Sequence, residues 1–71
     1  MSIVTSPVTG SVWKIEVAVG DTVTAGLEVA IIESMKMEIP AEAEVAGVVA
    51  ELLVAEGDAV SDGDPLMRID P

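Results

Sequence analysis

The chain has 71 residues, with 13 acidic and 3 basic side chains and a formal net charge of -10. It contains no His, Cys, Tyr or Phe and only one Trp, so it lacks the usual nucleophilic and acid–base groups of an enzyme acting alone, and imidazole or thiolate metal sites are impossible. The acidity and the lack of aromatic stacking groups also argue against binding to nucleic acid or to anionic membranes.

The predicted elements, taken in chain order, are short strands separated by turns. Residues 13–19 alternate between apolar and other side chains with a period of two and end at the turn dipeptide Gly20-Asp21. Gly26 marks another turn, residues 29–32 form a short apolar run, and residues 48–54 form a similar one. The last turns are expected at Gly57-Asp58 and at residues 63–65. Strands that recur every 8 to 12 or so residues predict an all-β sandwich or barrel.

The sequence repeats itself at an offset of 37 positions, so that residues 8–34 align without a gap with residues 45–71. The identical pairs are Val8/Val45, Gly10/Gly47, Val12/Val49, Val17/Val54, Ala18/Ala55, Gly20/Gly57, Asp21/Asp58, Val23/Val60, Gly26/Gly63 and Ile32/Ile69. Three aligned glycines and a repeated Gly-Asp pair are not explained by the abundance of Val and Ala. We therefore expect a single domain over residues 1–71, with about four strands in each half and an approximate two-fold axis. The connector, residues 35–44, is expected at the end opposite the termini.

Lys36 is one of two lysines and lies in the connector between two methionines, Met35 and Met37. One interpretation is a solvated turn lysine between buried methionines. Its position at the junction of the two halves favours a functional role. A lysine amine is almost fully protonated at neutral pH, so it is a poor nucleophile unless an enzyme supplies an activated partner.

The stretch Glu33-Ser34-Met35-Lys36-Met37-Glu38 resembles the attachment motif of the biotinyl domain family, the biotin carboxyl carrier domains. The pattern Gly-Asp-x-Val-x-x-Gly, which begins at Gly20 and again at Gly57, also resembles this family, and the similarity covers essentially the whole chain. The resemblance implies a flattened barrel of two four-stranded antiparallel sheets related by a pseudo-two-fold axis. Because the halves align without a gap, we expect no inserted loop, or thumb, of the kind that some carrier subunits have.

The resemblance also implies a role for each residue of the hairpin at 33–38. Lys36 would carry biotin as an amide, Met35 and Met37 would be recognised by the biotin protein ligase, and Glu33, Ser34 and Glu38 would form the hairpin context. The chain would be a non-catalytic carrier that shuttles a carboxyl group from a biotin carboxylase to a carboxyltransferase. An acyl-CoA carboxylase, such as the acetyl-CoA carboxylase of fatty acid biosynthesis, is the expected setting. The carrier is expected to be cytoplasmic, and monomeric when isolated.

Two alternatives remain open, namely a lipoyl carrier with the same barrel, and an unmodified adaptor or structural module. Among the other residues, Trp13 and Met67 are expected in the core, and Asp21 and Asp58 are expected to bind backbone N–H groups of their turns. The spacing of Asp58, Asp62 and Asp64 does not match a calcium loop, so no metal site is expected.

Overall fold

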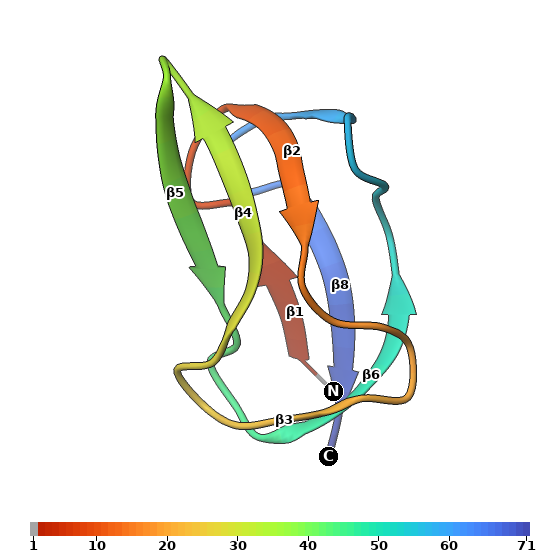
Figure 1. Ribbon diagram of the computed structural model, residues 1–71. Helices are drawn as coiled ribbons and strands as arrows, with labels where there is room; N and C mark the ends of the chain where they lie inside the picture. The colour runs from red at the N-terminus through yellow and green to blue at the C-terminus, as the bar shows by residue number, and fades with distance from the viewer. Residues whose placement is uncertain (1) are drawn as a thin grey trace.

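The computed structural model describes residues 2–71 and consists of strands joined by turns and loops (Figure 1). The strands are β1 (Ser2–Thr5), β2 (Gly10–Ile15), β3 (Thr22–Val23), β4 (Glu28–Ser34), β5 (Met37–Glu42), β6 (Gly47–Leu52), β7 (Ala59–Val60) and β8 (Pro65–Asp70). They form two antiparallel four-stranded sheets with the orders β1-β8-β6-β3 and β5-β4-β2-β7. The predicted all-β fold is confirmed. In the described residues no helix is long and apolar enough to cross a membrane.

The structure repeats with the same 37-residue offset as the sequence. The N–H of Ala18 donates to an Asp21 carboxylate oxygen at 2.9 Å, and the N–H of Ala55 donates to Asp58 at the same distance. Each of these aspartates therefore binds a backbone N–H group of its own turn, as predicted. Gly20, Gly26, Gly57 and Gly63 adopt φ values of 97°, 88°, 95° and 87°, which side chains disfavour, so the glycines recur where the turns need them.

The axis also relates segments outside the aligned sequence. The repeat makes β4 equivalent to β8. Because β5 pairs with β4 and β1 pairs with β8, β5 in the connector is equivalent to β1. The tip of the β4–β5 hairpin lies at one end of the long dimension and both termini lie near the other (Figure 1). The connections from β2 to β3 and from β6 to β7 have the same length, so the first half has no inserted loop.

The core lies between the two sheets and consists mainly of valine, isoleucine and alanine side chains. It is formed by Val4, Val12, Val23, Val29, Ala30, Ile32, Ala41, Ala43, Val49, Val60, Leu66, Met67 and Ile69. Met67 is fully buried, as predicted. The hairpin is held in place by the pairing of β4 with β2, whose side chains contribute to this core.

The prediction that Trp13 fills the core is wrong, because its side chain is 49% exposed. Val12 is opposite Ile32 and Lys14 is opposite Ile31, so Trp13 is an extra residue in a β-bulge. The bulge interrupts the period of two, and Val12 takes the buried position. Ala50, the repeat equivalent of Trp13, lies at the matching bulge of β6.

Three carboxylates lie close together on the sheet that carries the hairpin, at the end away from its tip. Glu28 is opposite Glu42 across β4 and β5, and Glu16 lies beside Glu28. A hydrogen bond with the Glu16 carboxyl, partial burial, and the negative charges of Glu16 and Glu42 together raise the pKa of Glu28 above its ordinary value of 4.5. The ionised form of Glu28 is therefore less favourable in the folded chain than in the unfolded chain.

Glu28→Gln is expected to raise the melting temperature at pH 7. Because the pKa of Glu28 is higher in the folded chain than in the unfolded chain, ionisation of Glu28 lowers the free energy of unfolding. This loss is absent below the unfolded-state pKa, grows as the pH rises to the folded-state pKa, and is constant above it. The gain should therefore shrink on acidification and vanish below about pH 4. Thermal denaturation of both proteins between pH 3 and 8 measures this, with Glu44→Gln as the control, because Glu44 is exposed and forms no ion pair with residues 2–71. A gain for Glu28→Gln that does not change with pH would contradict the assignment.

Candidate functional site

The β4–β5 hairpin places the motif predicted from the sequence in a two-residue turn. Ser34 is opposite Met37 in the last pair of the ladder, and Met35 and Lys36 form the turn between them. Both turn residues have positive φ, 52° for Met35 and 66° for Lys36. Two positive φ values are the requirement of a type I′ turn, whose twist matches that of the flanking strands.

This turn is unusual in composition because type I′ turns favour Asn-Gly. The left-handed conformation costs about 1–2 kcal/mol for a residue with an ordinary side chain. The pairing of β4 with β5 next to the turn offsets this cost. In that ladder Glu33 is opposite Glu38 and Ile32 is opposite Ile39. Met35 and Lys36 are therefore held in conformations that neither side chain favours.

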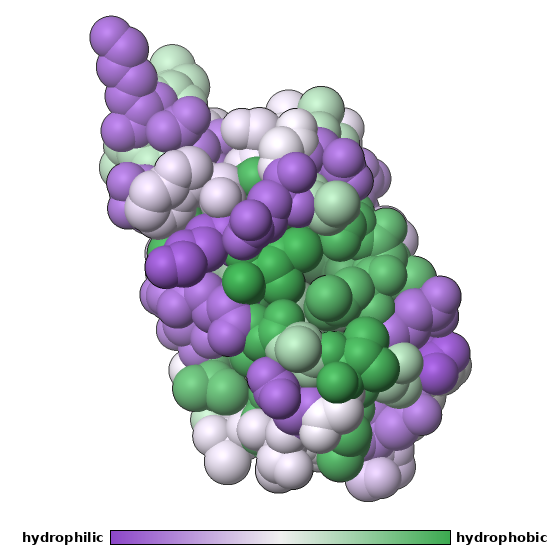
Figure 2. All heavy atoms as spheres, turned by 45° about the vertical axis from the view of Figure 1, so that its right-hand side comes forward, coloured by the Kyte–Doolittle hydropathy of each residue, from purple (hydrophilic) through white to green (hydrophobic). Residues whose placement is uncertain are grey.

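The side chains of the turn are presented to solvent. Met35 is 93% exposed and Met37 is 62% exposed, so the interpretation with buried methionines is wrong. Lys36 is exposed and forms no ion pair with any residue from 2 to 71. In Figure 2 the tip of the hairpin projects beyond the rest of the surface as a narrow hydrophilic column. A large enzyme can therefore reach the amine from several directions.

The last pair of the hairpin before the turn is attached to the loop that precedes β2. The Ser34 hydroxyl donates to the Thr9 carbonyl oxygen at 2.8 Å, and the N–H of Asp62 donates to the Thr9 hydroxyl at 3.0 Å. Gly10 brings β2 so close to β4 that a Cβ atom there would lie 2.2 Å from the Glu33 carbonyl oxygen. Sequence reasoning placed Ser34 in the hairpin and missed Thr9 and Asp62. The aligned glycines at 10 and 47 were the one sequence signal for this close approach.

The carboxylates of Glu33 and Glu38 are exposed cross-strand partners two pairs below the tip. All six residues of the predicted motif are thus brought together on one hairpin. The structure also has a cavity of about 570 Å³, lined by Thr5, Pro7, Gly26 and residues 40–44. Neither Lys36 nor its neighbours in the turn line it, so the candidate site is a projecting tip and not a pocket.

The geometry fits the covalent attachment of a cofactor to a lysine amine. The residues described by the structure contain no cluster of three or more His, Cys, Asp or Glu side chains that could hold a metal ion. The amine of Lys36 is solvent-exposed, is free of ion pairs within residues 2–71, and stands on a rigid ladder. A group attached there would be carried clear of the barrel.

Comparison with known proteins gives concordant results. Residues 2–69 match a family model described as biotin-requiring enzyme. The chain is 50% identical over 60 residues to a biotin/lipoyl attachment protein of Bacillus subtilis (strain 168), which covers 84% of this chain and 82% of that protein. It is 41% identical over 75 residues to the biotin carboxyl carrier protein of acetyl-CoA carboxylase from Nostoc sp. (strain PCC 7120 / SAG 25.82 / UTEX 2576), covering 96% of this chain and 41% of that one.

The fold is also found in a solved structure. The crystal structure of the Kluyveromyces lactis urea carboxylase superposes with a TM-score of 0.91 and 42% sequence identity. The match covers 97% of this chain and 6% of that chain. The barrel described above therefore corresponds to one small part of a large carboxylase.

Proposed function

Because this chain belongs to the biotin/lipoyl attachment family of biotin-requiring enzymes, we propose that it is a biotin carboxyl carrier with biotin joined to the Nζ atom of Lys36. The observation that carries the proposal is the strained two-residue turn, which presents Lys36 between two exposed methionines at the tip of a rigid hairpin. The names of the relatives support biotin as the cofactor.

The attachment reaction assigns simple roles to the residues of the chain. A biotin protein ligase would present biotin as an acyl adenylate. The Lys36 amine would lose a proton and attack the acyl carbon, forming the amide bond as the bond to AMP breaks. Met35 and Met37 offer the ligase adaptable apolar contacts on either side of the amine. The φ values of the turn fix the direction in which the Lys36 side chain leaves the backbone.

The carrier would serve a biotin carboxylase and a carboxyltransferase in turn. When attached, biotin supplies the nitrogen that takes up and gives up a carboxyl group. The chain contributes a projecting, rigid attachment point that raises the local concentration of the group at both enzymes. We propose an acyl-CoA carboxylase as the setting, supported by the relative from Nostoc. The chain itself supplies no catalytic residue, and the carrier works in the cytoplasm.

The test is the mass of the intact chain after expression with an active biotin protein ligase and free biotin. We expect the mass of the chain to increase by that of one biotin minus one water, and we expect the modified chain to bind streptavidin. A chain that stays unmodified under these conditions would contradict the proposal. Lipoate in place of biotin on Lys36, after co-expression with a lipoate ligase as well, would establish the lipoyl carrier instead.

A further inference from the structure

An apolar strip crosses the outer face of the sheet that carries the Lys36 hairpin. It consists of Trp13 on β2, Ile31 on β4 and Pro40 on β5, and the exposed side chain of Lys14 lies beside Trp13 on the same face. Lys14, next to Trp13, is opposite Ile31, which is opposite Pro40 across the next ladder. Trp13 is 49% exposed, Pro40 is exposed and Ile31 is half-buried. We call this the Trp13 strip.

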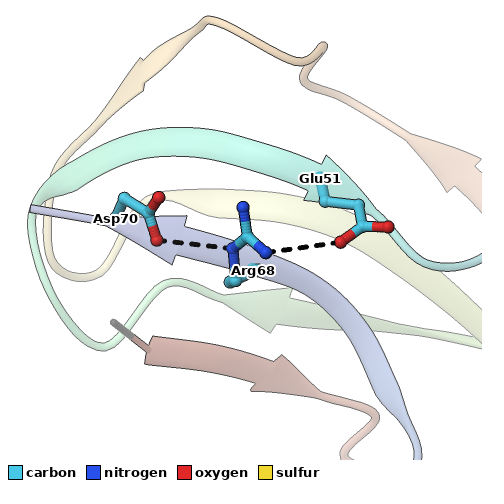
Figure 3. Close-up of polar contacts among 3 residues, drawn as sticks. All are labelled: Glu51, Arg68 and Asp70. Atoms are coloured by element: carbon cyan, nitrogen blue, oxygen red, sulfur yellow. Dashed lines mark hydrogen bonds and ion pairs between the residues drawn. The ribbon is translucent and has the colours of Figure 1, made fainter.

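The other half of the molecule lacks this strip, although its backbone is equivalent. An offset of 37 places Ala50, Arg68 and Ile3 at the positions of Trp13, Ile31 and Pro40. Arg68 lies 3.5 Å from Glu51 and 3.4 Å from Asp70, so a charged network occupies the centre of the opposite face (Figure 3). The fold therefore does not require an apolar residue at Trp13 or Ile31, and their presence on the hairpin sheet needs another reason.

Carboxylates border the Trp13 strip on both sides along the sheet. Glu33 and Glu38 lie between the strip and the tip, and Glu16, Glu28 and Glu42 lie beyond it. An apolar centre that contains a tryptophan and has a charged rim is the arrangement found in protein interfaces. The five carboxylates outnumber the single ammonium group of Lys14 beside the strip, and the chain carries a charge of -10, so the complementary surface is apolar at its centre and mainly basic at its edge.

The distance from the tip identifies the kind of partner. Val12 is opposite Ile32, so Trp13 lies about 13 Å along the sheet from Lys36. An ordinary interface of about 800 Å² per partner has a radius of about 16 Å, so an enzyme centred on the Lys36 amine also covers the strip. The enzyme that modifies the amine must approach this closely, whereas enzymes that act on attached biotin can meet it at the far end of a long arm.

We propose that the Trp13 strip is a docking surface for the biotin protein ligase, and that Trp13 is the principal contact. The inference rests on the proposed function. It concerns a surface that is separate from the motif and does not include Lys36, Met35 or Met37. Basic groups of the ligase would face the carboxylates on both sides of the strip, and this would make association faster at low salt.

The test is the steady-state biotinylation of the unmodified chain by its ligase, with ATP and biotin saturating and the chain varied. Trp13→Ala is expected to lower kcat/KM by about tenfold or more, through KM, with kcat nearly unchanged. The variant should fold, because Ala50 occupies the equivalent bulge in the other half. Ile31→Arg, which introduces the residue found at position 68, is expected to weaken docking as strongly through repulsion by the basic rim.

The matched control is Ile3→Ala, which removes an apolar side chain that is 40% exposed on the opposite sheet. It should leave kcat/KM within about twofold of the original value, as expected for a residue outside the interface. If the original chain is biotinylated and both Trp13→Ala and Ile31→Arg match it in kcat/KM, the docking surface is wrong and the proposed function stands. If the original chain accepts no biotin, the proposed function itself fails. A fall in kcat with KM unchanged would also overturn the docking role.

Discussion

Lys36→Arg is expected to abolish the incorporation of biotin. The guanidinium keeps the positive charge and nearly the length of the side chain, but it does not lose a proton in proteins and cannot form the amide. Lys36 is exposed and forms no ion pair among residues 2–71, so the free energy of unfolding should change by less than about 0.5 kcal/mol. The intact mass and streptavidin binding after expression with the ligase measure the loss.

Lys14→Arg is the matched control, since Lys14 is the other lysine of the chain and is also exposed. Lys14 lies within the β2 ladder opposite Ile31, where the backbone is extended and the side chain does not stand on a turn. We expect this variant to be biotinylated as fully as the original chain. If Lys36→Arg still carried biotin and Lys14→Arg did not, the assignment of the attachment site to Lys36 would be wrong.

The all-β class and the approximate two-fold symmetry could be predicted from the sequence because two kinds of signal agree, whereas the two four-stranded sheets were implied by the family resemblance. The repeat supplies the symmetry, and the glycines at 20, 26, 57 and 63 mark turns whose φ values of 87° to 97° glycine adopts at much lower cost than residues with side chains. The connector had to join the halves, and its place opposite the termini followed from the axis. The turn glycines are local signals, and the repeat is found by aligning the chain with itself. Both can therefore be read from a single sequence.

The facts that the sequence did not reveal depend on pairing between strands. The bulge at Trp13 belongs to the register of β2 against β4, and nothing in residues 13–19 marks the break in alternation. The same stretch was expected to continue as a strand to residue 19. It ends at Ile15, because the chain crosses to the other sheet, where the Gly20 N–H donates to the Val49 carbonyl oxygen at 2.8 Å.

The same distinction between local signals and strand pairing applies to the candidate site. Lys36 and its neighbours were identified from a contiguous motif. The bond from Ser34 to Thr9 joins residues 25 positions apart, and the bond from Asp62 to Thr9 joins residues 53 apart. The grouping of Glu16, Glu28 and Glu42 likewise needs the register of β4 against β5 and the contact of Glu16, just after β2, with β4. Such contacts require a register that composition and local periodicity do not fix.

Gly10→Ala is expected to destabilise the fold by about 1–3 kcal/mol, because it forces backbone apart inside a packed sheet. A Cβ atom at this position would lie 2.2 Å from the Glu33 carbonyl oxygen and 3.2 Å from a methyl group of the buried Ile32 side chain. The nearest obstacle is backbone, so no rotamer change removes the clash and β2 must move away from β4. For a chain of this size each kcal/mol corresponds to about 4–8 °C in melting temperature. Thermal denaturation followed by circular dichroism measures the loss.

Gly47→Ala separates the effect on the fold from the effect on the site. Its Cβ atom would lie 2.2 Å from the Asp70 carbonyl oxygen, the symmetry equivalent of the Glu33 contact, so its melting temperature should fall by a similar amount. That clash lies at the end where the chain finishes, whereas Gly10 packs against Glu33, two pairs from the tip of the Lys36 hairpin. At a temperature where both variants are folded, biotinylation should therefore slow for Gly10→Ala and not for Gly47→Ala. Equal slowing in both would mean that the ligase responds only to global stability, and an unchanged melting temperature in both would refute the close approach of the strands.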